Sequence, residues 1–292
     1  MKSASIVKDK IFRQLLFVAA ALIILISAGM IYSLTTGSFG AFSKFGFFKF
    51  TFTSAWNPTA GSENYGALSF IIGTLLTSFV ALLLCIPFSL PVALFTGEYF
   101  KGTKIASFLG TVTDLLAGIP SIVYGLWGFY TLRPIVQSLG LGENGFGILT
   151  AGFVLAIMII PYAASLSGEF FKLVPDDLKE GAYSMGATRL EVVRHISLPM
   201  AGTGIFASYV LALGRALGET MAVTMLIGNT NGIPFGLTST GNTMASIIAN
   251  QFGEADGLKL SSLIALGLLL FLLTAIINLI GRLIMKRVAV KV

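Results

Sequence analysis

Six long apolar stretches limit the folds open to this chain more than any other feature of its sequence. Hydrophobic residues make up 55% of the chain and charged residues only 11%, whereas a soluble domain carries about 25% charged residues. A helix needs roughly 20 apolar residues to span a bilayer. Six stretches are long enough, at about 15–34, 67–95, 105–130, 146–167, 201–228 and 260–285. The sequence therefore predicts an all-α membrane protein with six transmembrane helices in a lipid bilayer.

Prolines and glycines interrupt two of these stretches. Pro87 and Pro91 are expected to kink the second stretch or to end it early. Gly118 and Pro120 are expected to bend or interrupt the third. The first stretch is too long for the apolar region of a signal peptide and no clear cleavage site follows it, so we interpret it as a retained first span.

The distribution of basic residues predicts the orientation of the chain in the membrane. With the N-terminus inside, fourteen of the nineteen Lys and Arg residues lie in the cytoplasm, and only Lys44, Lys49, Arg133 and Lys259 lie outside. Six spans then return the C-terminus to the starting side. We expect a multi-pass protein of the cytoplasmic membrane with both termini in the cytoplasm. The net charge of +6 is a topology signal and does not indicate nucleic-acid binding.

The spans divide the chain into three parts. Residues 1–66 contain a cytoplasmic tail, the first span and an external aromatic segment. Residues 67–285 form the transmembrane core with a cytoplasmic loop at 168–200, and residues 286–292 form a basic cytoplasmic tail.

Two external segments have distinct compositions. In the aromatic segment, Phe48, Phe50 and Phe52 alternate with polar residues, which predicts a half-buried strand before a turn at Trp56. This segment either contacts an external partner or forms an aromatic belt at the membrane surface. Segment 229–257 is rich in Gly, Asn, Thr and Ser. We expect it to be a flexible or partly re-entrant loop.

The cytoplasmic loop begins with a short predicted helix. Pro175 followed by two aspartates is typical of the first helical turn. Gly186 suits the left-handed conformation that ends a helix. Ala182, Tyr183 and Met185 precede it and are expected to form an apolar knob at the bend, where a partner protein could bind.

A second short helix follows in the same loop. Thr188 and Glu191 have the spacing of a capping box, so this helix is expected to begin near Arg189. Pro199 is expected to end it and to begin the next span.

Two charged residues lie inside the fifth stretch. Arg215 and Glu219 are four residues apart, and we expect them to share one helix face. Charges in a bilayer usually face a cavity or a partner, and Gly214 and Gly218 allow another helix to approach closely. One hypothesis is an anion path in which Arg215 attracts the anion and Glu219 tunes its charge. The alternative is a buried ion pair that holds helices together.

Asp114 is a third charged residue inside the predicted membrane region. It precedes the expected break at Gly118 and Pro120. Backbone groups released at such a break face protein or water, so Asp114 and Ser121 could line a polar path. Asp114 could equally pair with a basic group of another subunit.

The spacing within the cytoplasmic loop resembles the "EAA" loop of ATP-binding-cassette importer permeases, which an ATPase subunit binds. Gly181 departs from that pattern at a position where alanine is usual. The resemblance implies that these residues contact the ATPase: Glu180, Ala182, Tyr183, Met185, Gly186, Ile196, Leu198 and Pro199.

Further segments resemble the phosphate importer in particular. They are YGALSFIIGTLLTS at 65–78, AGIPSIVYGLWG at 117–128 and LGRALGETMAVTMLIGN at 213–229, and GETMAVT is similar to the PstC-type permeases. The resemblance covers nearly the whole chain from about residue 60. It implies a type I importer permease with a MetI-like fold. It also implies a second homologous permease, an ATPase dimer and an external phosphate-binding protein as partners.

Several alternatives remain open at this point. The chain contains no G-x-x-x-x-G-K-[ST] motif, so a separate chain is expected to hydrolyse ATP. With one histidine and one cysteine, and without a nucleophile–base pattern, neither a metal site, a cofactor nor an enzyme is expected. The anion could instead be sulfate, molybdate or another oxyanion. An ion-coupled secondary transporter using Arg215, Glu219 and Asp114 is a further alternative, but it leaves the EAA-type loop without a function.

Overall fold

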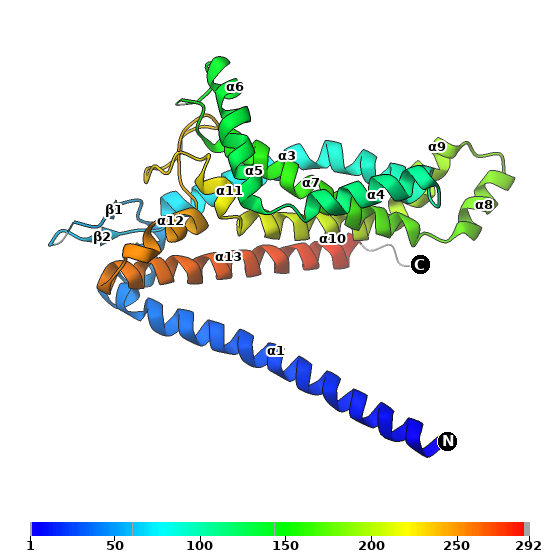
Figure 1. Cartoon of the computed structure of the whole chain (residues 1–292), viewed down its shortest axis with the longest axis horizontal. Helices are drawn as coiled ribbons and strands as arrows, with labels where there is room; N and C mark the ends of the chain where they lie inside the picture. Colours follow the sequence, from blue (N-terminus) through cyan, green and yellow to red (C-terminus); the bar gives the residue numbers. More distant parts are fainter. Residues whose placement is uncertain (1, 60, 143, 289–292) are drawn as a thin grey trace.

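The chain folds almost entirely into helices (Figure 1). This computed structural model describes residues 2–59, 61–142 and 144–288. Five helices are long and apolar enough to cross a membrane, and a bent pair of helices supplies a sixth candidate. The prediction of an all-α membrane protein with six spans is confirmed. Of the predicted tail at 286–292, residues 289–292 lie outside the described residues.

The candidate spans follow the predicted stretches, but several have different ends. The first helix runs past the predicted end at residue 34, and Pro87 and Pro91 lie inside the second without ending it. The spans are α1 (Lys2–Phe45), α3 (Leu68–Leu94) with the π-helical segment η1 (Phe95–Tyr99), α4 (Lys104–Ala117) with α5 (Ser121–Trp127), α7 (Ile148–Lys172), α10 (Leu198–Leu217) and α13 (Gly257–Val288).

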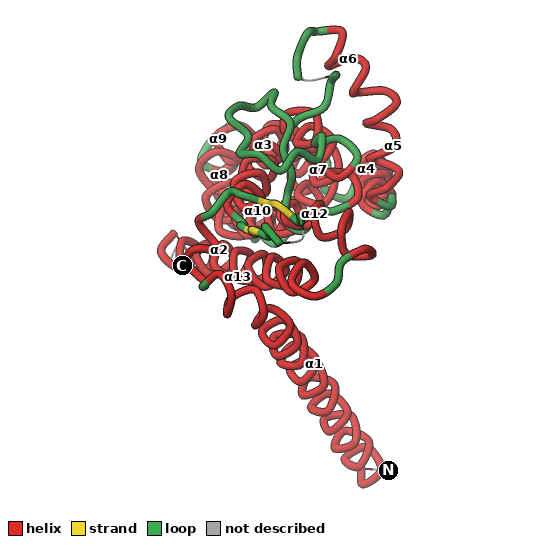
Figure 2. Tube along the Cα trace, turned by 90° about the vertical axis from the view of Figure 1, so that its left-hand side faces the viewer, coloured by secondary structure: helices red, strands yellow, loops and turns green. Residues whose placement is uncertain are grey.

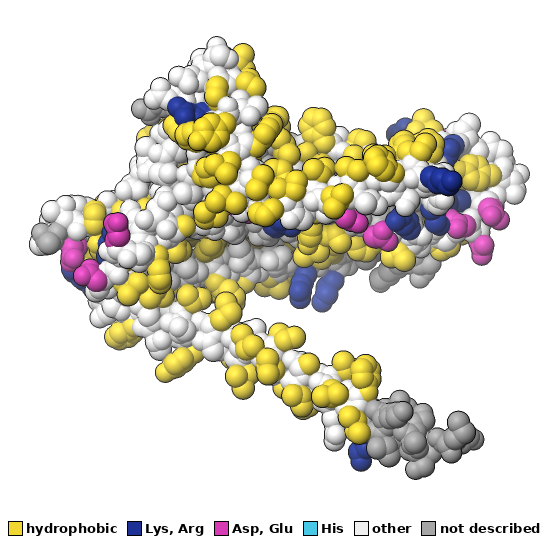
Figure 3. All heavy atoms as spheres, in the orientation of Figure 1, with side chains coloured by type: hydrophobic (Ala, Val, Ile, Leu, Met, Phe, Trp, Pro, Cys, Tyr) yellow, Lys and Arg dark blue, Asp and Glu magenta, His cyan; other side chains and the backbone are white. Residues whose placement is uncertain are grey.

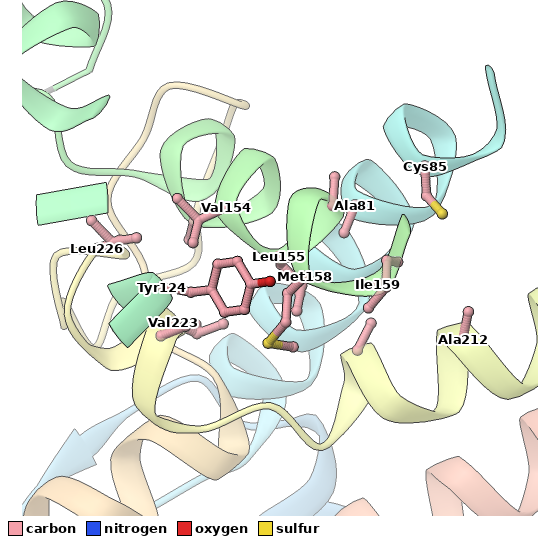
Figure 4. Packing of buried hydrophobic residues seen from close by; sticks show 14 of the residues in the cluster. Ala81, Cys85, Tyr124, Val154, Leu155, Met158, Ile159, Ala212, Val223 and Leu226 are labelled. Carbon is pink, nitrogen blue, oxygen red and sulfur yellow. The ribbon is translucent and has the colours of Figure 1, made fainter. Parts of the chain in front are cut away.

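Helix α7 lies at the centre of the bundle. Helices α3, α4 and α10 pack against it, while α13 packs against α10 and α1. Figure 1 shows that α1 leaves the other helices at an angle along much of its length. Side chains from α3, α5, α7, α10 and α11 (Met221–Thr224) meet in one core, where Tyr124 points toward Leu155 and Met158 (Figure 4).

The third span is broken where the sequence predicted a break. Helices α4 and α5 are bent by 88° around Gly118 and Pro120. The hydroxyl of Tyr124 donates to the carbonyl oxygen of Leu116 at 2.8 Å and so joins the two helices across the bend. The chain then continues through η2 (Gly128–Leu132) into α6 (Arg133–Ser138).

The predicted strand in the aromatic segment is wrong. Residues Phe47–Phe52 form helix α2, in which Phe50 is buried while Phe48 and Phe52 are exposed. Phe50 packs edge-on against Phe42 of α1 at 5.6 Å between ring centroids. Burial of this one ring outweighs the strand preference of the alternating pattern. The predicted turn at Trp56 is instead the short strand β1 (Trp56–Asn57), which pairs with β2 (Asn64–Tyr65).

The segment at 229–257 folds back onto the bundle instead of forming an irregular loop throughout. It contains α12 (Met244–Gln251) and the short η4 (Phe252–Glu254). Met244 is fully buried, and its backbone N–H donates to the hydroxyl of Thr74 on α3 at 3.0 Å. This segment therefore covers the end of α3.

The surface of the molecule has an apolar middle and charged ends (Figure 3). The beginning of α1, the end of α13 and the loop helices α8 (Asp176–Ser184) and α9 (Arg189–Val192) lie at one end, while β1, β2, α6 and α12 lie at the other. Figure 2 looks onto this second end, where the irregular segments gather. The described start of α1 and the described end of α13 therefore lie at the same end as the loop helices.

Candidate functional site

The loop at 168–200 has the predicted helix–turn–helix form. Helix α8 follows Pro175 and carries two aspartates in its first turn. Gly186 adopts a left-handed φ of 88°, as expected of the residue that ends a helix. Thr188 caps α9, and its backbone N–H and hydroxyl both donate to the Glu191 carboxylate at 2.7 Å. These hydrogen bonds hold the pKa of Glu191 below its usual value.

Replacing Thr188 with alanine is expected to loosen the start of α9. The substitution removes the side-chain half of the capping box, and loss of such a cap costs about 1 kcal/mol. Hydrogen exchange of the amides at 189–192 should become faster in T188A, while exchange along α7 stays as in the wild type. Equal exchange at 189–192 in both proteins would contradict a stabilising cap.

Exposed apolar side chains gather on the loop helices. Met185 is 85% exposed, and Leu178, Tyr183 and Leu190 are also exposed. These four residues are called the apolar knob below. They lie on or beside the loop helices at one of the two charged ends of the molecule. Exposed apolar patches rimmed by polar residues mark sites of protein contact.

Two of the predicted contact residues are less exposed than the others. Ala182 is only 7% exposed and faces the loop interior, where its carbonyl oxygen accepts from the N–H of Ala187 at 3.1 Å. Ile196 packs against the buried cluster around Ala93 and Phe171. Ile196 therefore helps to pack the loop against the bundle, while Ala182 is buried. The remaining predicted contact residues are exposed, namely Glu180, Tyr183, Met185, Gly186, Leu198 and Pro199.

Gly181 does not disturb the loop. A methyl group built at this position would meet no atom within 4 Å. Alanine, which is usual at this position of the resembling loops, would therefore fit here without strain.

The loop continues into the fifth span without a break. Helix α9, the π-helical segment η3 (Val193–Ser197) and α10 form one continuous helix at Arg189–Leu217. The prediction that Pro199 ends the second short helix of the loop is wrong. A proline ring clashes with the carbonyl four residues earlier in a regular helix, but that carbonyl belongs to His195 in the π segment. The i→i+5 turn there makes room for the ring.

Arg215 and Glu219 do not share a helix face, contrary to the sequence prediction. Helix α10 ends at Leu217, and Glu219 lies in the irregular backbone before α11. A carboxylate oxygen of Glu219 instead accepts from the N–H of Ala222 at 3.4 Å, at the start of α11. No ion pair joins Arg215 to Glu219 among the described residues, and Arg215 is exposed. The hypothesis of a buried ion pair is therefore wrong.

Helix α7 carries a strip of polar side chains that sequence reasoning missed. Tyr162, Ser165, Glu169 and Lys172 are spaced by three, four and three residues, which places them on one helix face. The guanidinium carbon of Arg215 lies 5.5 Å from the centroid of the Tyr162 ring. These four residues are called the polar strip below. Their helical spacing in an otherwise apolar span was the signal that could have revealed them.

Asp114 joins the polar strip from α4. The hydroxyl of Ser165 donates to a carboxylate oxygen of Asp114 at 3.2 Å. Beside them is a cavity of about 410 Å³ between α3, α4 and α7. Its polar lining includes Ser107, Thr111, Asp114, Ser165, Glu169 and Lys172.

Ser121 lies apart from these groups as far as the described hydrogen bonds show. It is half-buried and begins α5, directly after the bend. The structure therefore brings Arg215 and Asp114 to one face of α7, whereas Ser121 and Glu219 sit at the two breaks in the helices.

Most of the chain matches one protein family. Residues 89–290 match the family described as "Binding-protein-dependent transport system inner membrane component". The phosphate transport system permease protein PstC of Pasteurella multocida is 41% identical over 302 aligned positions, which cover 97% of this chain and 93% of the relative. The PstC protein of Mesorhizobium japonicum is 41% identical over 300 positions, which cover 96% and 90%.

Solved structures share the fold at low sequence identity. A structure of the MetNI methionine ABC transporter matches with a TM-score of 0.61 and 21% identity, covering 76% of this chain and 97% of that chain. An amino acid ABC transporter matches with a TM-score of 0.54 and 17% identity, covering 75% and 92%. The predicted MetI-like fold is thereby confirmed.

Proposed function

Because this chain belongs to the binding-protein-dependent transport system inner membrane components, and among them to the PstC permeases, we propose that it forms part of the path by which an ATP-driven importer moves inorganic phosphate. It is a multi-pass inner membrane component whose function is transport and not catalysis. The binding protein and the ATPase of the system are separate chains in this proposal.

The continuous helix at Arg189–Leu217 is the observation that carries this mechanism. Leu190 of the apolar knob is its second residue, and Arg215 lies in its last turn. At 1.5 Å per residue, these ends are roughly 40 Å apart. A stiff helix passes a movement of the loop to Arg215 without a flexible joint. ATP-driven movement of a bound ATPase would thus reach the polar strip.

The polar strip suits the passage of a hydrated anion. Arg215 supplies a positive charge beside Tyr162, and hydroxyl groups at Ser165, Ser107 and Thr111 continue the polar surface toward the loop end. Asp114 adds negative charge along the same route, while Glu169 is ion-paired with Lys172 at 2.7 Å. We propose that Arg215 attracts phosphate, while Asp114 keeps the anion from binding too tightly to leave.

The remaining partners follow from the open surface of the chain. A second homologous permease would cover the polar strip and close the path, since an anion path open to lipid would expose charge to hydrocarbon. An external phosphate-binding protein would dock at the end formed by β1, β2, α6 and α12. The loop helices and both termini would then lie in the cytoplasm.

Phosphate uptake by the whole importer tests the substrate. The chain, its partner permease, the ATPase and the binding protein would be reconstituted in proteoliposomes. We expect ATP-dependent uptake of radiolabelled phosphate that excess unlabelled phosphate abolishes and sulfate does not. Uptake that sulfate or molybdate suppresses more strongly would assign another oxyanion, and uptake driven by an ion gradient without ATP would favour the secondary transporter.

Replacing Met185 with glutamate is expected to release the ATPase. Met185 is the most exposed member of the apolar knob, and central contact residues contribute about 2 kcal/mol or more to binding, so ATPase recovery should fall at least tenfold. The measurement is co-purification of the ATPase with the permease from detergent. Phe235 is 94% exposed in the segment that packs beside the start of α7, away from the loop helices, and it provides a matched control, because F235E should retain the ATPase. Full recovery with M185E would exclude the knob as the docking site.

A further inference from the structure

A buried ion pair joins the loop helix α8 to the end of the second span. Lys179 Nζ lies 2.7 Å from Glu98 Oε2, and their side chains are only 9% and 5% exposed. Glu98 lies in η1, which continues α3. The hydroxyl of Ser197 in η3 donates to the other oxygen of Glu98 at 3.0 Å. One carboxylate therefore connects α3, α8 and the helix that leads to Arg215.

This pair differs in kind from the exposed ion pair beside it. Lys101 and Asp176 also join the end of the second span to α8, at 3.0 Å, but their side chains are 36% and 62% exposed. Exposed pairs contribute little because water screens them. Removing one partner of a buried pair leaves the other charge poorly compensated, so such a pair resists separation. Lys179 also lies 3.6 Å from Asp176, but that carboxylate is largely exposed and compensates less. Glu98 and Lys179 therefore hold α8 in place more firmly than their exposed neighbours.

The acidic partner is itself firmly held. Gly97, directly before Glu98, lies so close to α7 that an added Cβ would collide with the carbonyl oxygen of Gly168. Arg189, the first residue of α9, donates to the carbonyl oxygen of Tyr99 and lies 4.7 Å from the centroid of its ring. The segment around Glu98 thus contacts α7, α8 and α9 at once. A movement of α8 that displaces this segment would therefore also displace α3 or α7.

We propose that Glu98 is a positioning residue that transmits movement of the ATPase-bound loop to α3. This route runs through Lys179 and acts in parallel with the direct route along α10. Helices α3 and α7 pack against each other along the core, and α7 carries the polar strip. Both routes therefore end on the walls of the proposed path. The inference rests on the proposed function, because it requires an ATPase that binds α8.

The substitution Glu98→Gln tests this route in the complete reconstituted importer. Glutamine keeps the volume and can still accept from Ser197, but it lacks the charge that pairs with Lys179. We expect phosphate transported per ATP hydrolysed to fall about tenfold, the size of a typical coupling free energy. Co-purified ATPase should match the wild type. A residue with only a structural role would change the amount of assembled complex but not the phosphate transported per ATP hydrolysed. If E98Q transports as much phosphate per ATP as the wild type, even with less complex assembled, the proposal is overturned.

Two further variants complete the test. K101Q breaks the exposed pair between the same two segments, and its ratio should stay within about twofold of the wild type. The reversed pair E98K/K179E restores the ion pair and should regain most of the phosphate transport per ATP that E98Q loses. If E98Q does not assemble, the E98K/K179E variant tests the proposal by itself. A complex of this variant that assembles but transports little phosphate per ATP hydrolysed would contradict the proposal.

Failure of the proposed function gives a different result. A wild-type importer that does not transport phosphate would overturn that function without reference to Glu98. The ratio would then be measured with the oxyanion that the importer does transport, and the same comparison of E98Q with the wild type would apply.

Discussion

Replacing Arg215 with glutamine is expected to abolish most phosphate uptake while the importer still assembles. Arg215 is exposed at the end of α10, beside Tyr162 on the polar strip. Hydrogen bonds to charged groups contribute roughly 1.5–3 kcal/mol, so loss of the guanidinium should slow uptake by about tenfold to a hundredfold. Uptake of radiolabelled phosphate into proteoliposomes gives the rate, and size-exclusion chromatography of the detergent-solubilised complex gives the assembly.

Two matched substitutions show whether the charge is what matters. R215K keeps a positive charge and should retain part of the uptake, although lysine lacks the planar fork of arginine. Arg133 also lies over aromatic rings, at 4.9 Å from Phe129 and 4.3 Å from Phe146, but away from the polar strip. R133Q should therefore transport nearly as the wild type does. Wild-type uptake in R215Q would exclude Arg215 from the phosphate path.

Replacing Gly97 with alanine is expected to separate the end of the second span from α7. A Cβ at this position would collide with the carbonyl oxygen of Gly168 and would lie 2.9 Å from the Cβ of Phe171. Two of the three nearest atoms belong to backbone, so rotation of a side chain cannot relieve the clash. Overpacking of this kind costs about 1–3 kcal/mol. We expect a lower thermal transition of the detergent-solubilised protein and faster hydrogen exchange at 95–99.

Gly29 provides the control for this substitution. It lies in helix α1, and a Cβ built there would meet no atom within 4 Å. G29A should leave the thermal transition unchanged or raise it, because alanine favours helix over glycine by up to about 1 kcal/mol. If G97A and G29A have the same transition temperature, the close packing at Gly97 does not stabilise the fold.

The local features of the loop at 168–200 could be predicted from the sequence because each depends on neighbouring residues. Thr188 and Glu191 are three residues apart, and they form the expected capping box. Gly186 adopts the expected left-handed conformation. The break at Pro120 follows from the missing N–H and the fixed ring of proline. In each case the residues that decide the conformation lie within one helical turn of one another.

The sequence predictions failed where distant segments decide the conformation. Phe50 was expected in a strand, but its ring is buried in a helix against Phe42. Glu219 was expected on the helix face of Arg215, but α10 ends before it. Ala182 was expected in the exposed knob, but it turns inward where the loop closes onto the bundle. Side-chain spacing predicts a shared face only while the helix continues.

From the sequence alone follow the apolar spans, the turn of the loop at 168–200 and the presence of a charged arginine in the fifth span. Hydrophobicity, helix caps and proline act on neighbouring residues, so these features can be predicted from the order of residues along the chain. Which polar groups meet depends instead on how the helices pack. Glu98 and Lys179 are 81 residues apart, and Asp114 and Ser165 are 51 residues apart. The free energy of such a contact depends on burial and on the approach of helices remote in the chain, and no local pattern encodes either.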